Sequence, residues 1–460
     1  MQCLAPTTTS RRCGALAVAA GLGLALGACG GSSSNPNGAS ASTPVNTSTS
    51  PQTSQTSNNV QASASSCGSK PGTQATGAPI PVGAIATKES GLDFSDAPNM
   101  VAAYFACVNA NGGIDGHPLK LYEEFDQAQP AQVTAAAHEL VDSDHVVAMV
   151  GNFDLIECTV DEQFLKSAGV YEITDGISPE CWSTSNSVPV NQGPRYSSDA
   201  AVQYAISHAH PSKIVFDNGN SPDASWIAAG AAAIAKANHV QFQEVLTNDP
   251  LTDPDSITLT LVDDAGANGV VMQNNNPPEV GQILDAAQKL GLSDRVKMWV
   301  ADSPADTDFL AKTLGPKWNH KLYISTEVQT PDDHSEPEMQ LYKAILNKYG
   351  QAVEGGVGAF SEFGFLDAGL FVHALEGMKP PYTRARVTAA ITNVKNYVNA
   401  LECLPLSVGS LPLHIPNYSG PIGTPDNGKI ITLQPCIEDS AGDPQIAQYR
   451  KAAMAAGLGS

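Results

Sequence analysis

The stretch that decides the fold is Asn109-Ala110-Asn111-Gly112-Gly113-Ile114-Asp115-Gly116, together with the segments on either side of it. Before it, apolar residues recur at helical spacing over 101–108, and Gly112-Gly113 supplies the positive-φ end that such a helix favours. After it, apolar residues alternate over 119–125, as they do in a strand. The turn therefore joins a predicted helix to a predicted strand.

The following residues repeat this alternation of helix and strand. Pro130 opens a second predicted helix, and the unbroken apolar run 146–150 is typical of a strand buried on both faces. A third helix and another strand follow before Gly176. Repeated β-α-β units require a parallel sheet, and parallel sheets place ligands at the carboxyl ends of their strands. The sequence thus predicts an α/β fold with a binding site.

This order of elements closely resembles the substrate-binding proteins of branched-chain amino acid ABC importers. In that family a first helix ends in an Asn-x-x-Gly-Gly-Ile-x-Gly turn, followed by a strand, an acidic residue and a helix ending in Leu-Val. Here these elements are 109–116, 119–125, Asp126 and Leu140-Val141, and the resemblance extends from about Ile80 to Cys436. It implies the type I periplasmic binding fold: two Rossmann-like lobes with parallel sheets, joined by a three-stranded hinge that closes about a ligand.

The length and the resemblance together predict five parts. About 375 residues after the tether are too many for one core, so two lobes are expected. Chain crossings between the lobes are predicted at 189–194, near 323–330 and within 404–435. The predicted parts are a lipoprotein signal peptide at 1–28, a disordered tether at 29–78, a first lobe at 79–195 and 326–408, a second lobe at 196–325 and 409–446, and a C-terminal helix or tail at 447–460.

The amino terminus predicts export and lipid attachment. Arg11-Arg12 precede the apolar run 15–28, which is too short to span a bilayer and is typical of a signal peptide. The run ends in Leu26-Gly27-Ala28-Cys29, which resembles a bacterial lipobox, so Cys29 would carry the lipid; a plain secretory signal with a chance cysteine is the alternative. Residues 30–78 are polar, with Lys70 as their only charge, and cannot fill a core. We expect a tethered protein on the extracytoplasmic face of the cell membrane.

The charge and the resemblance indicate which partners to expect. The net charge of -22 becomes -24 without Arg11 and Arg12, which argues against nucleic acid and against unaided binding to anionic lipid. The resemblance implies a small-molecule ligand and an ABC permease as partners, with the membrane reached through the lipid. We expect a monomer without a cofactor.

Six cysteines remain after the predicted cleavage site besides Cys29. An even number in an exported protein favours disulfides, and six cysteines allow 15 pairings. Their spacing lacks the C-x-x-C pairs of zinc and redox sites. The pairing we favour joins Cys158 to Cys181, Cys403 to Cys436, and Cys67 to Cys107.

Polar residues follow the predicted strands of both lobes, where a ligand cleft would take its contacts. Tyr196 is an aromatic candidate for closing over a ligand, and Glu362 stands at a helix start. The candidate ligand-binding residues are Asn152, Phe153, Asp154, Thr174, Asp175 and Ser178 in the first lobe, Tyr196, Asn220, Asn274 and Asp302 in the second, and Glu362.

Asp154 departs from the family pattern. The family holds a ligand carboxylate with a serine and backbone amides at the helix after the first loop, and with a threonine in the second loop. Ser178 stands where that threonine is expected, but Asp154 and Leu155 occupy the turn of the serine. Asp154 either caps its helix or faces the cleft, and in the second case it favours a cationic, amide-like or polyhydroxylated ligand.

No catalytic motif supports an enzyme. Residues 219–223 read Gly-Asn-Ser-Pro-Asp and fail the last position of a G-x-S-x-G elbow, and no H-E-x-x-H, Walker loop or G-x-G-x-x-G occurs. The acidic groups at 249–255 and 332–334 lack the Gly and terminal Glu of a calcium loop. We therefore expect a binding protein without catalytic or metal-binding residues. A sensor of the same fold, signalling to a regulator, is the first alternative, and a hydrolase is the second.

Overall fold

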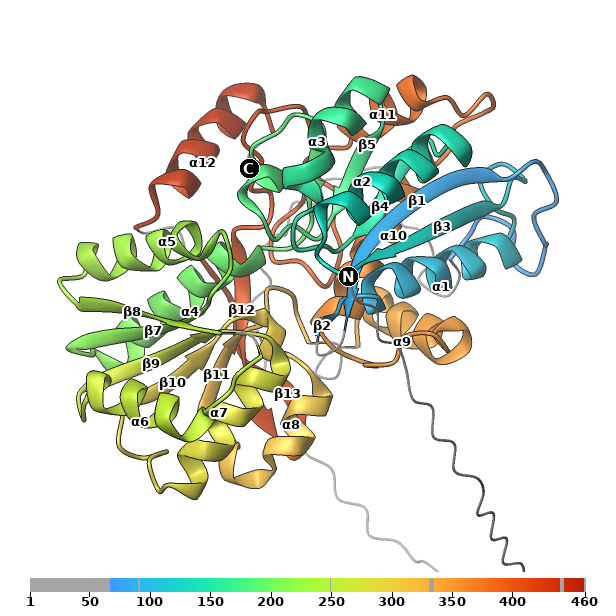
Figure 1. Cartoon of the computed structure of the whole chain (residues 1–460). Helices are drawn as coiled ribbons and strands as arrows, with labels where there is room; N and C mark the ends of the chain where they lie inside the picture. The colour runs from blue at the N-terminus through green and yellow to red at the C-terminus, as the bar shows by residue number, and fades with distance from the viewer. Residues whose placement is uncertain (1–66, 90–91, 249, 331–334, 439–441, 459–460) are drawn as a thin grey trace, which may run out of the picture. The chain divides into compact units, whose positions relative to one another are not determined.

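The computed structural model describes residues 67–89, 92–248, 250–330, 335–438 and 442–458. They form two mainly parallel sheets, each covered by helices on both faces, which confirms the predicted α/β class (Figure 1). Among these residues, no helix is long and apolar enough to span a membrane.

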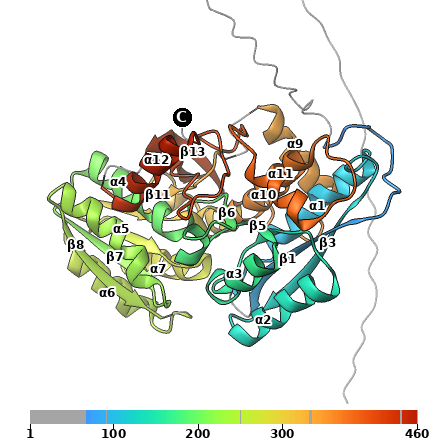
Figure 2. The same cartoon turned by 90° about the horizontal axis from the view of Figure 1, so that it is seen from above.

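The first sheet has the order β3-β1-β4-β5-β6, with β2 antiparallel to the end of β1. Figure 2 shows α1, α10 and α11 on one side of β1, and α2 and α3 on the other. The elements of this lobe are β1 (Ile80–Glu89), β2 (Leu92–Asp93), α1 (Asp96–Ala110), β3 (Leu119–Asp126), α2 (Pro130–His138), a π-helical turn (Glu139–Ser143), β4 (Ala148–Asn152), α3 (Glu157–Ala168), β5 (Tyr171–Thr174), η2 (Pro179–Trp182), β6 (Ser187–Pro189), α9 (Pro337–Tyr349), α10 (Ala359–Leu375) and α11 (Arg384–Thr392).

The second sheet has the order β8-β7-β9-β10-β11-β12-β13, and its last two strands are antiparallel. Apolar side chains of its strands point alternately to the two faces of the sheet. One face packs against α4 and α5, and the other packs against α6, α7 and α8. Its elements are α4 (Gly193–Ala209), β7 (Lys213–Gly219), α5 (Ala224–Ala237), β8 (Gln241–Thr247), α6 (Pro254–Ala265), β9 (Gly269–Asn274), α7 (Pro277–Lys289), β10 (Met298–Ala301), η3 (Ser303–Ala305), α8 (Asp308–Leu314), η4 (Pro316–Trp318), β11 (Leu322–Ser325), β12 (Ser419–Asp426), β13 (Lys429–Glu438) and the final helix α12 (Pro444–Ala456).

The glycine turn after α1 has the geometry that its sequence predicts. Gly112 and Gly113 have φ values of +107° and +59°. A Cβ on Gly113 would lie 2.3 Å from the carbonyl oxygen of His117, so only glycine fits. This turn sends the chain directly from α1 into β3 beside β1.

Three disulfides join the cysteine pairs that we favoured from the sequence. The Cα–Cα distances are 5.8 Å for Cys67–Cys107, 5.3 Å for Cys158–Cys181 and 5.5 Å for Cys403–Cys436. All three distances suit a disulfide.

The end of the predicted tether packs against the first lobe. Besides the Cys67–Cys107 disulfide, the backbone N–H of Lys70 donates to the carbonyl of Asn111, and that of Ala75 donates to the carbonyl of Asn109. The prediction of disorder is therefore wrong for 67–78, because the disulfide and these hydrogen bonds fix a segment whose composition alone is that of a linker. Cys29, the signal peptide and the rest of the tether lie outside the described residues.

Three crossings connect the two sheets, as a three-stranded hinge requires. Glu327, in the second crossing, accepts hydrogen bonds through Oε2 from the N–H groups of Gln192 (2.6 Å) and Gly193 (3.1 Å). Asn417, in the third crossing, donates through Nδ2 to the carbonyls of Val190 (3.1 Å) and Glu327 (3.4 Å). These two side chains tie all three crossings together.

Candidate ligand-binding site

Both sheets share one strand order, which locates a candidate site in each lobe. In the first lobe β1 lies between β3 and β4, and in the second β7 lies between β8 and β9. The helices that follow β1 and β3 (α1 and α2) lie on opposite faces of the first sheet, as do those that follow β7 and β8 (α5 and α6) on the second. A ligand crevice is therefore expected between the carboxyl ends of β1 and β4, and between those of β7 and β9.

Asp154 lies at this point of the first lobe, two residues before the N-cap of α3, and its carboxyl hydrogen-bonds to the start of that helix. Its Oδ1 accepts hydrogen bonds from the N–H groups of Ile156 and Glu157, both at 2.8 Å, and its Oδ2 accepts one from Thr87 Oγ1 at 3.0 Å. The residue is only 4% exposed. The geometry therefore supports the capping interpretation of Asp154, and its carboxyl already fills the amino-terminal amides that would suit an anion.

Asp154 also lies beside a second carboxyl group. Burial, with a hydrogen bond to Asp126 at the end of β3 as the next cause, raises the pKa of Asp154 to about 7. Asp126 is 1% exposed, and its oxygens accept no hydrogen bond from a backbone or hydroxyl group of the described residues. Two carboxyl groups thus lie close together at this edge of the sheet, with no ordinary hydrogen-bond donor of the described residues between them.

Phe153 belongs to an aromatic cluster at the same edge. Its ring stacks on Phe94 with centroids 4.5 Å apart, and meets Phe360 edge-on at 4.9 Å and Phe363 at 6.2 Å. Phe153 is buried, whereas Phe360, at the start of α10, is partly exposed. The structure thus gives the edge of the first lobe an apolar wall.

Asn152 and Thr174 brace the sheet. Asn152 Oδ1 accepts from the N–H of Ile85 (3.0 Å), and its Nδ2 donates to Glu172 Oε1 (2.6 Å). Thr174 Oγ1 donates to the carbonyl of Asn152 at 3.0 Å. Both predicted ligand contacts are therefore engaged within the lobe, where they hold β1, β4 and β5 in register.

Asp175 and Ser178 follow β5 and are also buried. Burial, followed by the charge of Asp367 on α10, raises the pKa of Asp175 well above its usual range. Ser178 Oγ lies 3.8 Å from Cys181 Sγ at the start of η2. This end of the strand is held by α10 and by the disulfide-bearing turn.

The corresponding edge of the second lobe is lined by amides. Asn274 donates through Nδ2 to Asn218 Oδ1 at 2.6 Å, and Asn275 donates to Asp217 Oδ2 at 2.7 Å. Thr247 Oγ1 donates to Asp217 Oδ1 at 2.9 Å. Burial raises the pKa of Asp217 to about 7, while its two donors lower it. The structure therefore pairs Asn274 with Asn218, while Asn275 and Thr247 both donate to Asp217.

Asn220, Tyr196 and Asp302 occupy different surroundings. Asn220 is exposed just beyond β7, and its Nδ2 lies 3.2 Å from Asn248 Oδ1. Tyr196 is fully buried against Trp182, 5.6 Å between ring centroids, and so has a packing role. Asp302 is fully buried at the end of β10, and burial, with the charge of Glu327 as the next cause, raises its pKa well above its usual range.

Glu362 lies where the two lobes touch. A small cavity of about 10 Å³ is lined by Asp306 of the second lobe, Glu362 of the first and Thr330 of the crossing between them. Beside it, the N–H of Ala359 donates to the carbonyl of Asp306 at 3.0 Å. The cavity has room for about one water molecule.

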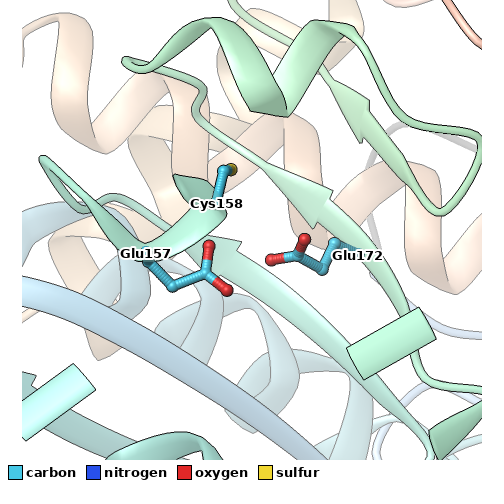
Figure 3. Close-up of side chains that lie close together, drawn as sticks. All are labelled: Glu157, Cys158 and Glu172. Carbon is cyan, nitrogen blue, oxygen red and sulfur yellow. The ribbon is translucent and has the colours of Figure 1, made fainter. Parts of the chain in front are cut away.

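One group of side chains has ligand atoms close enough to suggest a metal. Glu157, Cys158 and Glu172 each place one such atom within 4.8 Å of the others (Figure 3). Cys158 is bonded to Cys181, so it offers no thiolate, and Asn152 donates to one Glu172 oxygen. These contacts suit a pair of carboxyl groups better than a metal ion.

Sequence reasoning missed Thr87 at the end of β1, and Glu327 and Asn417 at the crossings. The Asn274-Asn275-Asn276 run was a visible signal for the second lobe. The other contacts join residues far apart in the chain, such as Gln192 and Glu327, which are 135 positions apart.

Comparison with known proteins decides the family. The sequence model of a family described as periplasmic binding protein matches residues 79–408. The chain belongs to this family. The match contains the first sheet and the parallel strands of the second, so the resemblance inferred from 109–116 is confirmed. Members of this family are substrate-binding proteins of the extracytoplasmic space.

Individual relatives of this periplasmic binding protein are distant. An amino acid binding protein of Pseudomonas aeruginosa is 28% identical over 213 residues, which cover 45% of this chain and 55% of the relative, about half its length. A fatty acid ABC transporter substrate-binding protein from Thermomonospora curvata superposes with a TM-score of 0.66 at 14% identity, covering 80% of this chain and 94% of that one. The branched-chain amino acid transporter substrate binding protein LivJ from Streptococcus pneumoniae, solved with isoleucine, gives 0.62 at 16%, covering 78% and 100%. The two solved structures establish the fold alone.

Proposed function

We propose that this protein is the lipid-anchored solute receptor of an ABC importer, which closes two lobes on a small polar ligand and delivers it to the permease. The observation that carries the proposal is the match to the periplasmic binding protein family over 79–408. The polar strand ends of both lobes and the hydrogen-bonded crossings support it, because they supply a site and a hinge. The lipobox-like sequence around Cys29 supports attachment through that residue.

The ligand class that fits best is an amino acid, an amide or a related compound. The position of Asp154 reduces the range of charges that such a ligand can carry. The Asp154 carboxyl occupies the N–H groups of Ile156 and Glu157, so a ligand carboxylate finds no free helix terminus there. Asn220, which is exposed just beyond β7, carries an amide that can both donate to and accept from a ligand. These features favour a neutral or cationic amide or amine over a simple branched-chain amino acid.

A thermal-shift screen tests the proposal. Amino acids, amides, polyamines, sugars and fatty acids are added to the mature protein, and a true ligand at 100 times its Kd is expected to add about 2.7 kcal/mol to the free energy of unfolding. Isothermal titration then gives the affinity. If none of these classes raises Tm, solute binding by this chain is contradicted. For the anchor, Cys29→Ala is expected to release the protein from membranes, and retention would refute lipidation.

A further inference from the structure

Three pairs of buried carboxyl groups cross-link the first lobe. Each pair joins two different elements, and all six residues are at most 4% exposed. The pairs are Asp126 with Asp154, Glu157 with Glu172, and Asp175 with Asp367. Buried carboxyl groups are rare unless a partner compensates them, so three such pairs in one lobe require a physical explanation.

The Glu157–Glu172 pair shows the arrangement directly. The two carboxyl groups point toward one another between α3 and β5 (Figure 3), with ligand atoms within 4.8 Å. Asn152 donates to Oε1 of Glu172, while Oε2 of Glu172 and Oε1 of Glu157 are buried without a backbone, hydroxyl or amide partner. Two ionised carboxylates have no donor to share, so one proton between them is the simplest way to satisfy both.

The other two pairs repeat this chemistry at the edge of the sheet. Both oxygens of Asp126, Asp175 and Asp367 are buried without a conventional donor. The charge of Asp126 at the end of β3 acts on Asp154 after β4, and the charge of Asp367 on α10 acts on Asp175 after β5. A proton on one member of each pair turns two repelling groups into a donor and an acceptor.

No basic side chain of the described residues forms an ion pair with any of the six. The charged groups around them are mostly acidic. Lys166 pairs with Glu162 at 3.6 Å, and His138 acts on Asp161. The surrounding titratable groups are Asp161 and Glu162 on α3, Glu327 in the second crossing, Glu402 after α11, Lys166 on α3 and His138 on α2.

We propose that three protons, each shared within one of these carboxyl pairs, hold the first lobe together, so that the protein is most stable in acidic surroundings. The proposal goes beyond solute binding and does not depend on a ligand. In ordinary acid denaturation, carboxylates lose their stabilising ion pairs when they become protonated, so stability falls as the pH falls. The proposal predicts the opposite: stability rises as the pH falls.

The sign follows from the direction of the shifts. Burial raises the pKa of Asp154 and of Glu172 to about 7, and raises those of Glu157, Asp175 and Asp367 well above their usual range. A raised folded-state pKa means that the folded protein binds more protons than the unfolded chain. The stabilisation is therefore complete below the unfolded-state pKa of about 4 and is lost as pH rises through about 7.

The test is the Tm of the mature, ligand-free protein from pH 5 to pH 8 at constant ionic strength, with a chelator present. We expect Tm to fall by roughly 5 °C or more over this range. A Tm that is constant or rises with pH overturns the proposal, and this result requires no variant to fold. Because no ligand is present, failure here leaves the binding function untouched.

Glu157→Gln tests whether the Glu157–Glu172 pair contributes to the fall in Tm. The glutamine amide can donate a hydrogen bond to Glu172 at every pH in the range. We expect this variant to have a higher Tm than the wild type at pH 8 and a smaller fall with pH. The matched control is Glu139→Gln, which removes the same charge from an exposed side chain. Equal pH profiles for the two variants contradict the proposal, and Asp175→Asn repeats the test if Glu157→Gln folds poorly.

Calcium chloride distinguishes a shared proton from a bound cation. Carboxylate oxygens suit Ca²⁺, so a cation between Glu157 and Glu172 would also relieve their repulsion. We expect added calcium, in place of the chelator, to leave the Tm of the wild type at pH 8 unchanged. A rise in Tm that disappears in Glu157→Gln would show that a metal ion, and not a proton, joins the pair, and would overturn the proposal.

Discussion

The two lobes share a strand order but stabilise their buried acids by different means. In the first lobe, acids face acids: Asp154 meets Asp126, and Glu157 meets Glu172. In the second lobe, Asp217 accepts hydrogen bonds from a threonine and an asparagine. Burial raises the pKa of Asp154 and of Asp217 alike to about 7, so the strand order fixes where polar side chains gather, but not which groups satisfy them.

The ion pair between Arg195 and Asp443 in the second lobe differs most from the carboxyl pairs of the first lobe. Asp443 Oδ2 accepts from Arg195 Nε at 2.8 Å and its Oδ1 from Nη2 at 3.1 Å, and both side chains are buried. Burial alone would raise the pKa of Asp443, but its hydrogen bonds, that of Arg195 first, lower it. Its contribution to stability is therefore present at neutral pH and is lost in acid, opposite in sign to the first-lobe pairs.

Arg195→Ala is expected to have the largest effect. It leaves Asp443 buried without its cation, which costs about 3–5 kcal/mol of unfolding free energy at pH 7. Urea denaturation measures the loss. The control is Lys321→Ala, which breaks the exposed pair with Asp294 and is expected to cost at most about 1 kcal/mol. Equal losses in the two variants would mean that burial does not distinguish these ion pairs.

Asn275→Ala tests the neutral network of the second lobe. It removes the donor to Asp217 Oδ2 and the acceptor for Thr247 Oγ1, so we expect a loss of about 1–3 kcal/mol. Urea denaturation at pH 5 and at pH 8 gives the loss in each charge state of Asp217. The loss is expected to be larger at pH 8, because an ionised Asp217 needs its donors more than a protonated one does. A larger loss at pH 5 would contradict the role of Asn275 as a donor.

The fold could be predicted from the sequence because its signals are local. The Gly112-Gly113 pair predicts a turn with positive φ, and the apolar run 146–150 predicts a strand buried on both faces. The structure has both features. The site was less predictable, because its contacts join distant positions. Asp154 gave two interpretations from its neighbours alone, and the hydrogen bond from Thr87, 67 positions earlier, supports one of them. Nothing local marks Asp175 as the partner of Asp367, since repulsive pairs leave no charge-complementary pattern.

The smallest expected difference lies between two helix caps. In the second lobe, Thr307 Oγ1 accepts from the N–H of Leu310 and caps α8 at 3.0 Å. Thr307→Ala is expected to cost about 1 kcal/mol at pH 5 and at pH 8 alike, because the hydroxyl does not titrate in this range. Asp154→Ala removes the cap of α3, but it also removes a carboxyl that repels Asp126 once its proton is lost.

The cost of Asp154→Ala is therefore expected to be about 1–2 kcal/mol at pH 5 and smaller at pH 8. Urea denaturation of both variants at both pH values gives four losses, and only the Asp154→Ala losses are expected to differ. Equal losses for Asp154→Ala would mean that its carboxyl acts as a simple cap whose proton is not shared with Asp126. In that case the starts of α3 and α8 would respond to pH in the same way. Only the pairs that contain Glu157 and Asp175 would then distinguish the first lobe from the second.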